Sequence, residues 1–152
     1  MLLSAKRRRD DGGAAAVEFA LVVPLLLVLV FGIIQYGWYF YAMQSGTSAT
    51  GDALRRLTVG ACQDNGELTA LVSDDLGAAL QGSLVAGPPT YKDASGADSA
   101  TPVAGGSVTL TVQFDTLDLH FPFLPVPDGG TVIRTQTARV EDATPAAGVT
   151  CS

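Results

Sequence analysis

Glu18 is the side chain whose position in this chain most needs a chemical explanation. It stands at the edge of the apolar run Phe19–Ile34, which reads FALVVPLLLVLVFGII and carries no charge. A carboxylate beside such a run is costly, and ionisable residues in apolar spans usually mark a function. Glu18 therefore needs a positively charged partner, and the basic residues that precede it belong to an N-terminal tail, Lys6–Arg9.

The element that positions Glu18 is predicted to be one membrane-spanning helix. The segment Ala14–Tyr36 would be roughly 34 Å long at ~1.5 Å per residue, which matches a hydrocarbon core of about 30 Å. Pro24 lies inside this span and removes one helical hydrogen bond, which membrane helices tolerate. The aromatic residues expected at the outer membrane–water boundary are Tyr36, Trp38, Tyr39, Phe40 and Tyr41.

The basic run Lys6–Arg9 predicts the orientation of this helix. Lys and Arg directly before an apolar span hold that end of the chain in the cytoplasm, whereas Asp10 and Asp11 count little. The N-terminus is therefore expected inside and the C-terminal part outside. The alternative is a solvated tail with no topological role.

Two other interpretations of the apolar segment are weaker. A helix buried in a soluble protein would need a larger domain around it than the roughly 95 residues that remain. A cleaved signal peptide would have an apolar stretch of roughly 7–15 residues before a small-residue cleavage site. The stretch here is longer, although Thr47-Ser48-Ala49 could mimic such a site.

Composition excludes several classes of function. The formal net charge is −6 and the isoelectric point about 4.4, so a nucleic-acid partner is not expected, because binding phosphates takes clustered Lys and Arg. His120 is the one histidine, and the sequence has no nucleophile motif, phosphate loop or metal-ligand cluster. We expect neither an enzyme nor a bound metal or cofactor.

The residues after the span predict a small α+β domain. The first helix is expected to continue to about Leu57, weakened by glycines and threonines in residues 46–51. Asp64 and Glu67 form a capping-box pattern that starts a second helix, ending near Gly82. The apolar stripe of this helix consists of Leu68, Leu71, Val72, Leu76, Ala79 and Leu80.

Two later segments are expected to pair as an antiparallel hairpin or meander. Val108–Phe114 alternates apolar with polar residues, as a half-buried strand does, and Thr131–Glu141 is rich in β-branched residues. Gly87–Pro89 and Ala94–Gly106 are typical of loops. The prolines of Leu119–Pro127 exclude a central strand. We favour a loop folded over the domain's own core there, the alternative being an apolar contact surface for another subunit.

Cys62 and Cys151 are the two cysteines of the chain. Outside the membrane they would meet oxidising conditions, so we predict a disulfide that ties the C-terminus to the end of the first helix. Two free thiols are the alternative. Two cysteines and one histidine make no metal site.

The segment Gly13–Pro24, which reads GAAAVEFALVVP, resembles the processing site and helix start of type IV pilin-like proteins. It is most similar to the TadE-like group of the tight-adherence (Tad/Flp) pilus system. In that family a prepilin peptidase removes a short basic leader that ends in Gly. The fifth residue of the mature chain is Glu, and an aromatic residue follows it. Residues 49–60 and 138–141 are weakly similar to later parts of such chains.

The resemblance implies a specific cut. The peptidase would cleave after Gly13, Ala14 would become the N-terminus, and Glu18 and Phe19 would be the fifth and sixth residues. A cut after Gly12 would place the glutamate sixth, so the spacing favours Gly13.

The resemblance also gives Glu18 a partner. A free amine on Ala14 would have a reference pKa of roughly 7.7–8.0 and be positive near neutral pH. In pilin-like families the Glu of one subunit is thought to meet the N-terminal amine of its neighbour during assembly, and our hypothesis is the same role for Glu18. The alternatives are that Glu18 pairs with its own Ala14 one helical turn away, or that it reaches the lipid headgroups.

The resemblance implies three parts: a basic leader, residues 1–13; a transmembrane and extended helix, residues 14–57; and an extracytoplasmic α+β domain, residues 58–152. The expected function is that of a minor pilin or pseudopilin in the assembly of an adhesive Tad-type pilus. Its expected place is the inner membrane, or outside the cell within a pilus. Expected partners are the membrane, the prepilin peptidase, the major pilin, other pseudopilins and the inner-membrane assembly platform. The alternative is a membrane-tethered envelope module that binds an external ligand and joins no filament.

Overall fold

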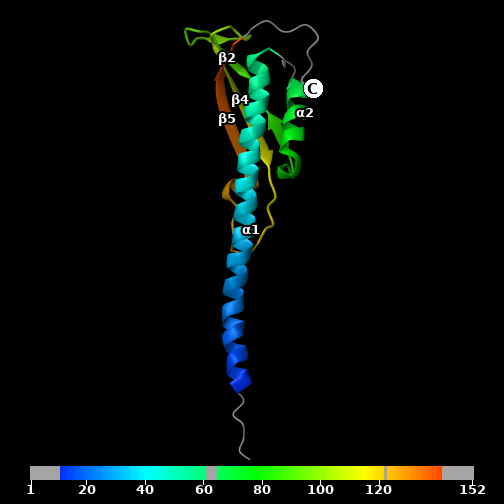
Figure 1. Cartoon of the computed structure of the whole chain (residues 1–152), viewed down its shortest axis with the longest axis vertical. Helices are drawn as coiled ribbons and strands as arrows, with labels where there is room; N and C mark the ends of the chain where they lie inside the picture. The colour runs from blue at the N-terminus through cyan, green and yellow to red at the C-terminus, as the bar shows by residue number, and fades with distance from the viewer. Residues whose placement is uncertain (1–10, 61–64, 122, 142–152) are drawn as a thin grey trace, which may run out of the picture.

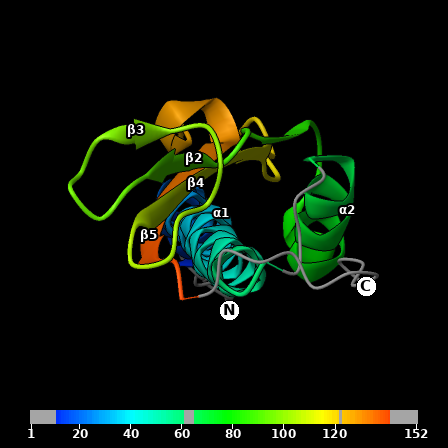
Figure 2. The same cartoon turned by 90° about the horizontal axis from the view of Figure 1, so that it is seen from above.

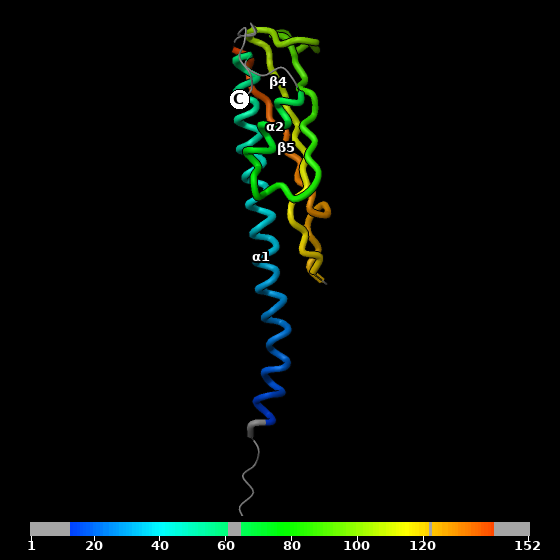
Figure 3. The backbone as a smooth tube through the Cα atoms, turned by 90° about the vertical axis from the view of Figure 1, so that its right-hand side faces the viewer, coloured from blue at the N-terminus to red at the C-terminus, as the bar shows by residue number. Residues whose placement is uncertain are grey.

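The protein is built around one long helix. The computed structural model describes residues 11–60, 65–121 and 123–141, and α1 (Asp11–Thr58) runs along its long axis (Figure 1). The N-terminal half of α1 projects away from the other elements, which gather around its C-terminal half (Figure 3). The predicted α+β class, a long apolar helix followed by a small domain, is confirmed.

The remaining elements form one small domain. They are α2 (Asn65–Leu76), the 3-10 turns η1 (Gly77–Ala79) and η2 (Pro127–Gly130), and the strands β1 (Leu84–Ala86), β2 (Thr90–Lys92), β3 (Asp98–Ser99), β4 (Ser107–Asp115) and β5 (Thr131–Arg139). The predicted disulfide between Cys62 and Cys151, the Asp64 cap and the basic run Lys6–Arg9 lie outside the described residues.

β4 is the central strand of an antiparallel sheet. β5 pairs with it along its whole length, from Ser107↔Arg139 to Asp115↔Thr131. The other edge of β4 is shared, because β1 pairs with residues 112–114 and β2 with residues 107–109, and β3 in turn pairs with β2. The predicted antiparallel pair is therefore confirmed, with β5 ending at Arg139 rather than at Glu141.

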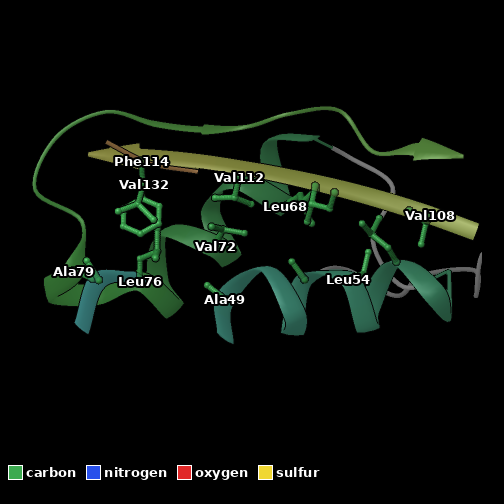
Figure 4. Packing of buried hydrophobic residues seen from close by; sticks show 14 of the residues in the cluster. Ala49, Leu54, Leu68, Val72, Leu76, Ala79, Val108, Val112, Phe114 and Val132 are labelled. Carbon is green, nitrogen blue, oxygen red and sulfur yellow. The ribbon is translucent and has the colours of Figure 1, made fainter. Parts of the chain in front are cut away.

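The alternating side chains of β4 give the sheet one buried and one exposed face. The buried face carries Val108, Leu110, Val112 and Phe114, none of which is exposed at all, and Figure 4 shows three of them over the helices. The other face carries threonines, whose hydroxyls pair across the strands at 2.7 Å for Thr109–Thr137 and 2.9 Å for Thr111–Thr135. α1 and α2 lie side by side on the buried face (Figure 2).

Small residues let α1 approach the sheet closely. Ala42, Ala49 and Ala53 are buried, and they lie on one face of the helix together with Gly46. A Cβ built on Gly46 would come within 2.6 Å of the Phe114 ring. Glycine is therefore required at this position for packing, although it costs roughly 1 kcal/mol relative to alanine in a helix.

The weak point expected in residues 46–51 does not interrupt α1, which is continuous there. The Thr50 hydroxyl donates to the Gly46 carbonyl at 2.7 Å. From β5, the Gln136 amide donates to the Thr47 carbonyl at 2.8 Å. Contacts from the sheet thus hold a segment of low helix propensity in the helix.

The second helix is shorter than expected. Leu68, Val72 and Leu76 of its predicted stripe are buried, but α2 ends at Leu76 instead of continuing to near Gly82. Gly77 has a φ of +48°, and a glycine in the left-handed region just after the last helical residue is a common way to end a helix.

Three short strands were not expected from the sequence. β1 and β2 flank the loop Gly87–Pro89, and β3 lies inside Ala94–Gly106, so the prediction of a loop is wrong at Asp98–Ser99. These strands have only two or three residues, too few to show an alternating pattern. They exist because β4 and its neighbours offer hydrogen-bond partners, which is a tertiary effect.

The carboxylate of Asp115 joins the entry of β1 to the start of β5. It accepts hydrogen bonds from the Ser83 hydroxyl, from the Ser83 amide at 3.2 Å and from the Thr131 hydroxyl at 3.0 Å. The bond from the Ser83 hydroxyl, followed by that from Thr131, lowers the pKa of Asp115 below its ordinary value.

We expect Gly46→Ala to destabilise the domain. The added methyl group must displace the Phe114 ring, and overpacking of this kind costs roughly 1–3 kcal/mol, which outweighs the gain in helix propensity. Thermal unfolding of the full chain in detergent measures the change. Gly37→Ala is the matched control, since a Cβ there meets nothing within 4 Å. A Gly46→Ala variant as stable as Gly37→Ala would contradict the close approach.

We expect Asp115→Asn to reduce the loss of stability in acid. A carboxyl whose pKa is lowered in the folded state stabilises the fold above its unfolded pKa of about 3.9, and this contribution disappears as the pH falls through the folded pKa. The melting temperature of the native chain should therefore fall more between pH 6 and pH 3 than that of the variant. Equal falls would show that Asp115 does not carry this dependence.

Candidate assembly site on the N-terminal helix

Most of the N-terminal half of α1 has no cover from its own chain. Among the described helices, α1 is the one long and apolar enough to cross a membrane, and its most apolar 18-residue window has a mean hydropathy of 2.8 and is 0% buried. Leu21 and Leu25 are each 73% exposed and Ile33 is 67% exposed. Such a surface needs lipid or another protein around it, so the interpretation as a buried core helix does not fit.

The alternative of a cleaved signal peptide conflicts with the core. Thr47-Ser48-Ala49 lies within the C-terminal half of α1, and Ala49 is buried in the domain core. Cleavage there would remove Tyr39, Ala42 and Gly46 from the domain, where the first two are buried and the third contacts Phe114.

The predicted processing site, Gly13 and Ala14, lies in the first turns of α1, which begins at Asp11. Both residues are exposed, and a Cβ on Gly13 would meet nothing within 4 Å. Because Gly12 and Gly13 each weaken a helix by roughly 1 kcal/mol, little stability is lost if this turn opens in a peptidase.

Glu18 lies one helical turn after Ala14 and is exposed. Residues four apart are neighbours on a helix surface, so the carboxylate and the predicted new N-terminus share a face. Within residues 11–60, 65–121 and 123–141, Glu18 has no ion pair with a basic side chain. Its surroundings are apolar and equally exposed, as at Val17 and Val22.

Phe19 and Pro24 share the helix with Glu18 but not its face. At ~100° per residue, Phe19 lies about 100° and Pro24 about 240° around the axis from Glu18. Phe19 is 69% exposed, and the helix continues through Pro24. The structure thus brings Ala14 and Glu18 together and leaves the other two as separate contact points for lipid or a neighbouring helix.

A residue that sequence analysis missed, Gln35, ties the domain to the end of the span. Its side chain is 1% exposed; Nε2 donates to the Leu117 carbonyl at 2.9 Å, and Oε1 accepts from the Leu119 amide at 3.0 Å. The neighbouring Tyr36 hydroxyl donates to the Pro125 carbonyl at 2.9 Å. The signal that could have identified Gln35 was an amide inside an apolar segment, because a buried amide requires hydrogen-bond partners.

The segment Leu119–Pro127 was expected either to fold over the domain core or to form a contact surface for another subunit, and the structure has features of both. Val126 is buried in the domain core, as expected for a loop folded over it. Phe121 and Leu124 of this loop contact α1 at Phe31 and Gly32, and Phe123 is 92% exposed.

We expect Gln35→Leu to lower the free energy of unfolding by roughly 1–3 kcal/mol, because the Leu117 carbonyl and the Leu119 amide lose their partner. Amide hydrogen exchange of Leu119 should also become faster. The matched control is Gln44→Leu, since Gln44 is exposed on the same helix. Unchanged exchange at Leu119 would show that Gln35 does not hold the loop.

Comparison with known proteins bears on the N-terminal part of the chain. A family model described as TadE-like protein matches residues 13–55, a range that contains Gly13 and Glu18 and ends within α1, before α2 and the sheet. No curated protein and no solved structure matches the chain. The predicted resemblance is confirmed by this match over residues 13–55, which is consistent with a TadE-like protein of Tad pilus systems.

Proposed function

We propose that this protein is a minor pilin or pseudopilin that takes part in assembling an adhesive Tad-type pilus. The single observation that carries the proposal is the exposed Glu18 one turn after Ala14, within a segment that is TadE-like. The role is structural: the protein contributes a helix and a small domain to an assembly.

The proposed location is the inner membrane, with α1 as a single-pass anchor. The bare apolar surface of α1 supports this location. The basic run Lys6–Arg9 before the span supports a cytoplasmic N-terminus and an extracytoplasmic domain. After assembly the same apolar surface would be covered by neighbouring helices of the filament in place of lipid.

The proposed mechanism begins with the prepilin peptidase. Cleavage of the peptide bond after Gly13 leaves a protonated amine on Ala14, and Glu18 supplies a negative charge close to it. In an apolar environment a charge without a partner is costly. Docking of two subunits so that the Glu18 carboxylate of one meets the Ala14 amine of the next removes this cost for both groups and fixes their register along the helix axis.

The partners of the proposal follow from these steps. The peptidase acts on the leader, the assembly platform of the inner membrane receives the processed chain, and the major pilin and other pseudopilins present matching helices. The domain would then pack on its neighbours outside the membrane.

The experiment that tests the proposal is the mass of the mature chain purified from its own host. We expect a chain that begins at Ala14. A chain that retains Lys6–Arg9, in a host with an active prepilin peptidase, would overturn the proposal and favour a membrane-tethered envelope module that joins no filament. A cut after Gly12 would contradict the assigned position of Glu18.

Variants of Glu18 test its role in assembly. Glu18→Gln keeps the shape of the side chain and removes its charge, so we expect incorporation into surface filaments to fall by about tenfold or more, because leaving a buried charge without a partner costs roughly 3–5 kcal/mol. Glu18→Asp keeps the charge and should retain a substantial part of the incorporation. Equal incorporation of both variants and the native chain would show that the charge is not used in docking.

A further inference from the structure

The loop Leu117–Pro127, here called the proline loop, extends past the end of the sheet along the membrane-spanning part of α1 (Figure 3). The rings of Phe121 and Phe31 stack with their centroids 4.7 Å apart. The Leu124 side chain lies 3.6 Å from the position that a Cβ on Gly32 would take. The loop therefore contacts α1 at residues 31 and 32, which lie closer to the N-terminus of α1 than the hydrogen bonds that Gln35 and Tyr36 make with the loop.

These contacts place the loop at membrane depth. If the apolar span ends near Tyr36, Phe31 lies about 7–8 Å inside that end of the span, at ~1.5 Å per residue along the helix axis. Elements that lie in a membrane interface bury their apolar side chains about 5–10 Å into the boundary between headgroups and acyl chains. The tip of the proline loop is therefore at the depth of the leaflet on the domain's side of the membrane, whichever side that is.

The tip of the loop presents an apolar surface. Phe123 is 92% exposed, which is unusual for a large aromatic side chain in water. Near it, Leu124 and α1 form a shallow, open apolar hollow of about 450 Å³, which α1 lines with Leu25, Val28, Leu29, Gly32, Ile33 and Tyr36. This hollow is continuous with the bare surface of the span, so whatever covers the span also covers the hollow.

Several polar groups of the loop have partners inside the protein, which favours a lipid environment. Backbone groups in a bilayer need partners inside the protein, and Pro122, Pro125 and Pro127 have no amide hydrogen to satisfy. The Leu119 amide bonds to Gln35, the Leu124 amide donates to the Phe121 carbonyl at 3.2 Å, and the Pro125 carbonyl accepts from Tyr36.

The charged residues of the loop stand at its start. The Asp118 carboxylate accepts from the His120 amide at 2.8 Å and lies 3.7 Å from the His120 ring nitrogen Nε2. Both residues precede Phe121, and the His120 side chain is 85% exposed. This pair fits the headgroup level, where charged and apolar groups meet.

We propose that the proline loop inserts Phe123 and Leu124 into the lipid leaflet next to the domain, as a second membrane contact beside α1. This inference rests on the placement of α1 in a membrane under the proposed function. A helix alone leaves the domain free to rotate and tilt about the span, whereas a second contact fixes which side of the domain faces the membrane. The loop must also leave the lipid when the chain moves into a filament, so it couples the domain to that step.

Depth-dependent fluorescence quenching tests the insertion on the full chain. Trp38, the one tryptophan, is first replaced by phenylalanine, and a single reporter is then introduced as Phe123→Trp. The protein is reconstituted at low density in phosphatidylcholine–phosphatidylglycerol vesicles whose lipids carry bromine at a shallow or a deep acyl position. Leu25→Trp reports on the span, and Ala97→Trp reports on the exposed β2–β3 turn at the far end of the domain.

We expect quenching at Phe123→Trp to exceed that at Ala97→Trp at least threefold, with shallow bromines more effective than deep ones, and strong quenching at Leu25→Trp. If Leu25→Trp is quenched and Phe123→Trp behaves like Ala97→Trp, the insertion is wrong and the membrane placement of α1 stands. Emission from Phe123→Trp that is blue-shifted but not quenched means that a second protein copy covers the loop, which also overturns the proposal. Absence of quenching at Leu25→Trp overturns both the insertion and the membrane placement.

Discussion

The two halves of α1 lie in different environments, although the helix is continuous. Over its first half, most large apolar side chains are exposed, and the rest of the chain contacts this half mainly near Phe31 and Gly32, through the proline loop. Over its second half, residues from Tyr39 to Leu57 supply part of the domain core. Because a continuous helix transmits position and direction along its length, the register at which the second half meets the sheet also fixes where the domain stands relative to the first half.

α1 packs closely against the sheet because the residues on its contact face have small side chains. Gly46 and the alanines around it let β4 and β5 lie close to the helix, and Phe114 fills the space that a larger residue would take. Glycine at position 46 also lowers the intrinsic stability of the helix. The hydrogen bond from β5 and the packing of α2 offset this loss of stability. The C-terminal half of α1 is therefore part of the domain core, and the domain is not a separate unit beside the helix.

Two polar residues in the apolar part of α1 have different explanations. Gln35 is buried and finds both of its partners within the chain, in the proline loop. Glu18 is exposed, and the described residues offer it no ion-pair partner. A polar group that is satisfied internally stabilises the fold, whereas one that is left without a partner beside an apolar surface indicates a partner supplied from outside. On this distinction Gln35 is a structural residue, and Glu18 is the residue for which we propose a role in assembly.

Features that depend on short-range pattern and chemistry could be predicted from the amino-acid sequence. The length of the apolar segment predicted the span, and alternation and β-branched residues predicted β4 and its partner β5. The position of Glu18, four residues after Ala14, indicated a family whose model matches residues 13–55. The short strands β1 to β3, the tolerance of Gly46 inside α1 and the contact of the proline loop with the helix depend on tertiary packing, and the sequence did not predict them. In that contact Gln35 and Tyr36 bond to residues 82 to 89 positions away. Local periodicity carries no information about such partners, because they are set by how two distant segments are brought together by the sheet between them.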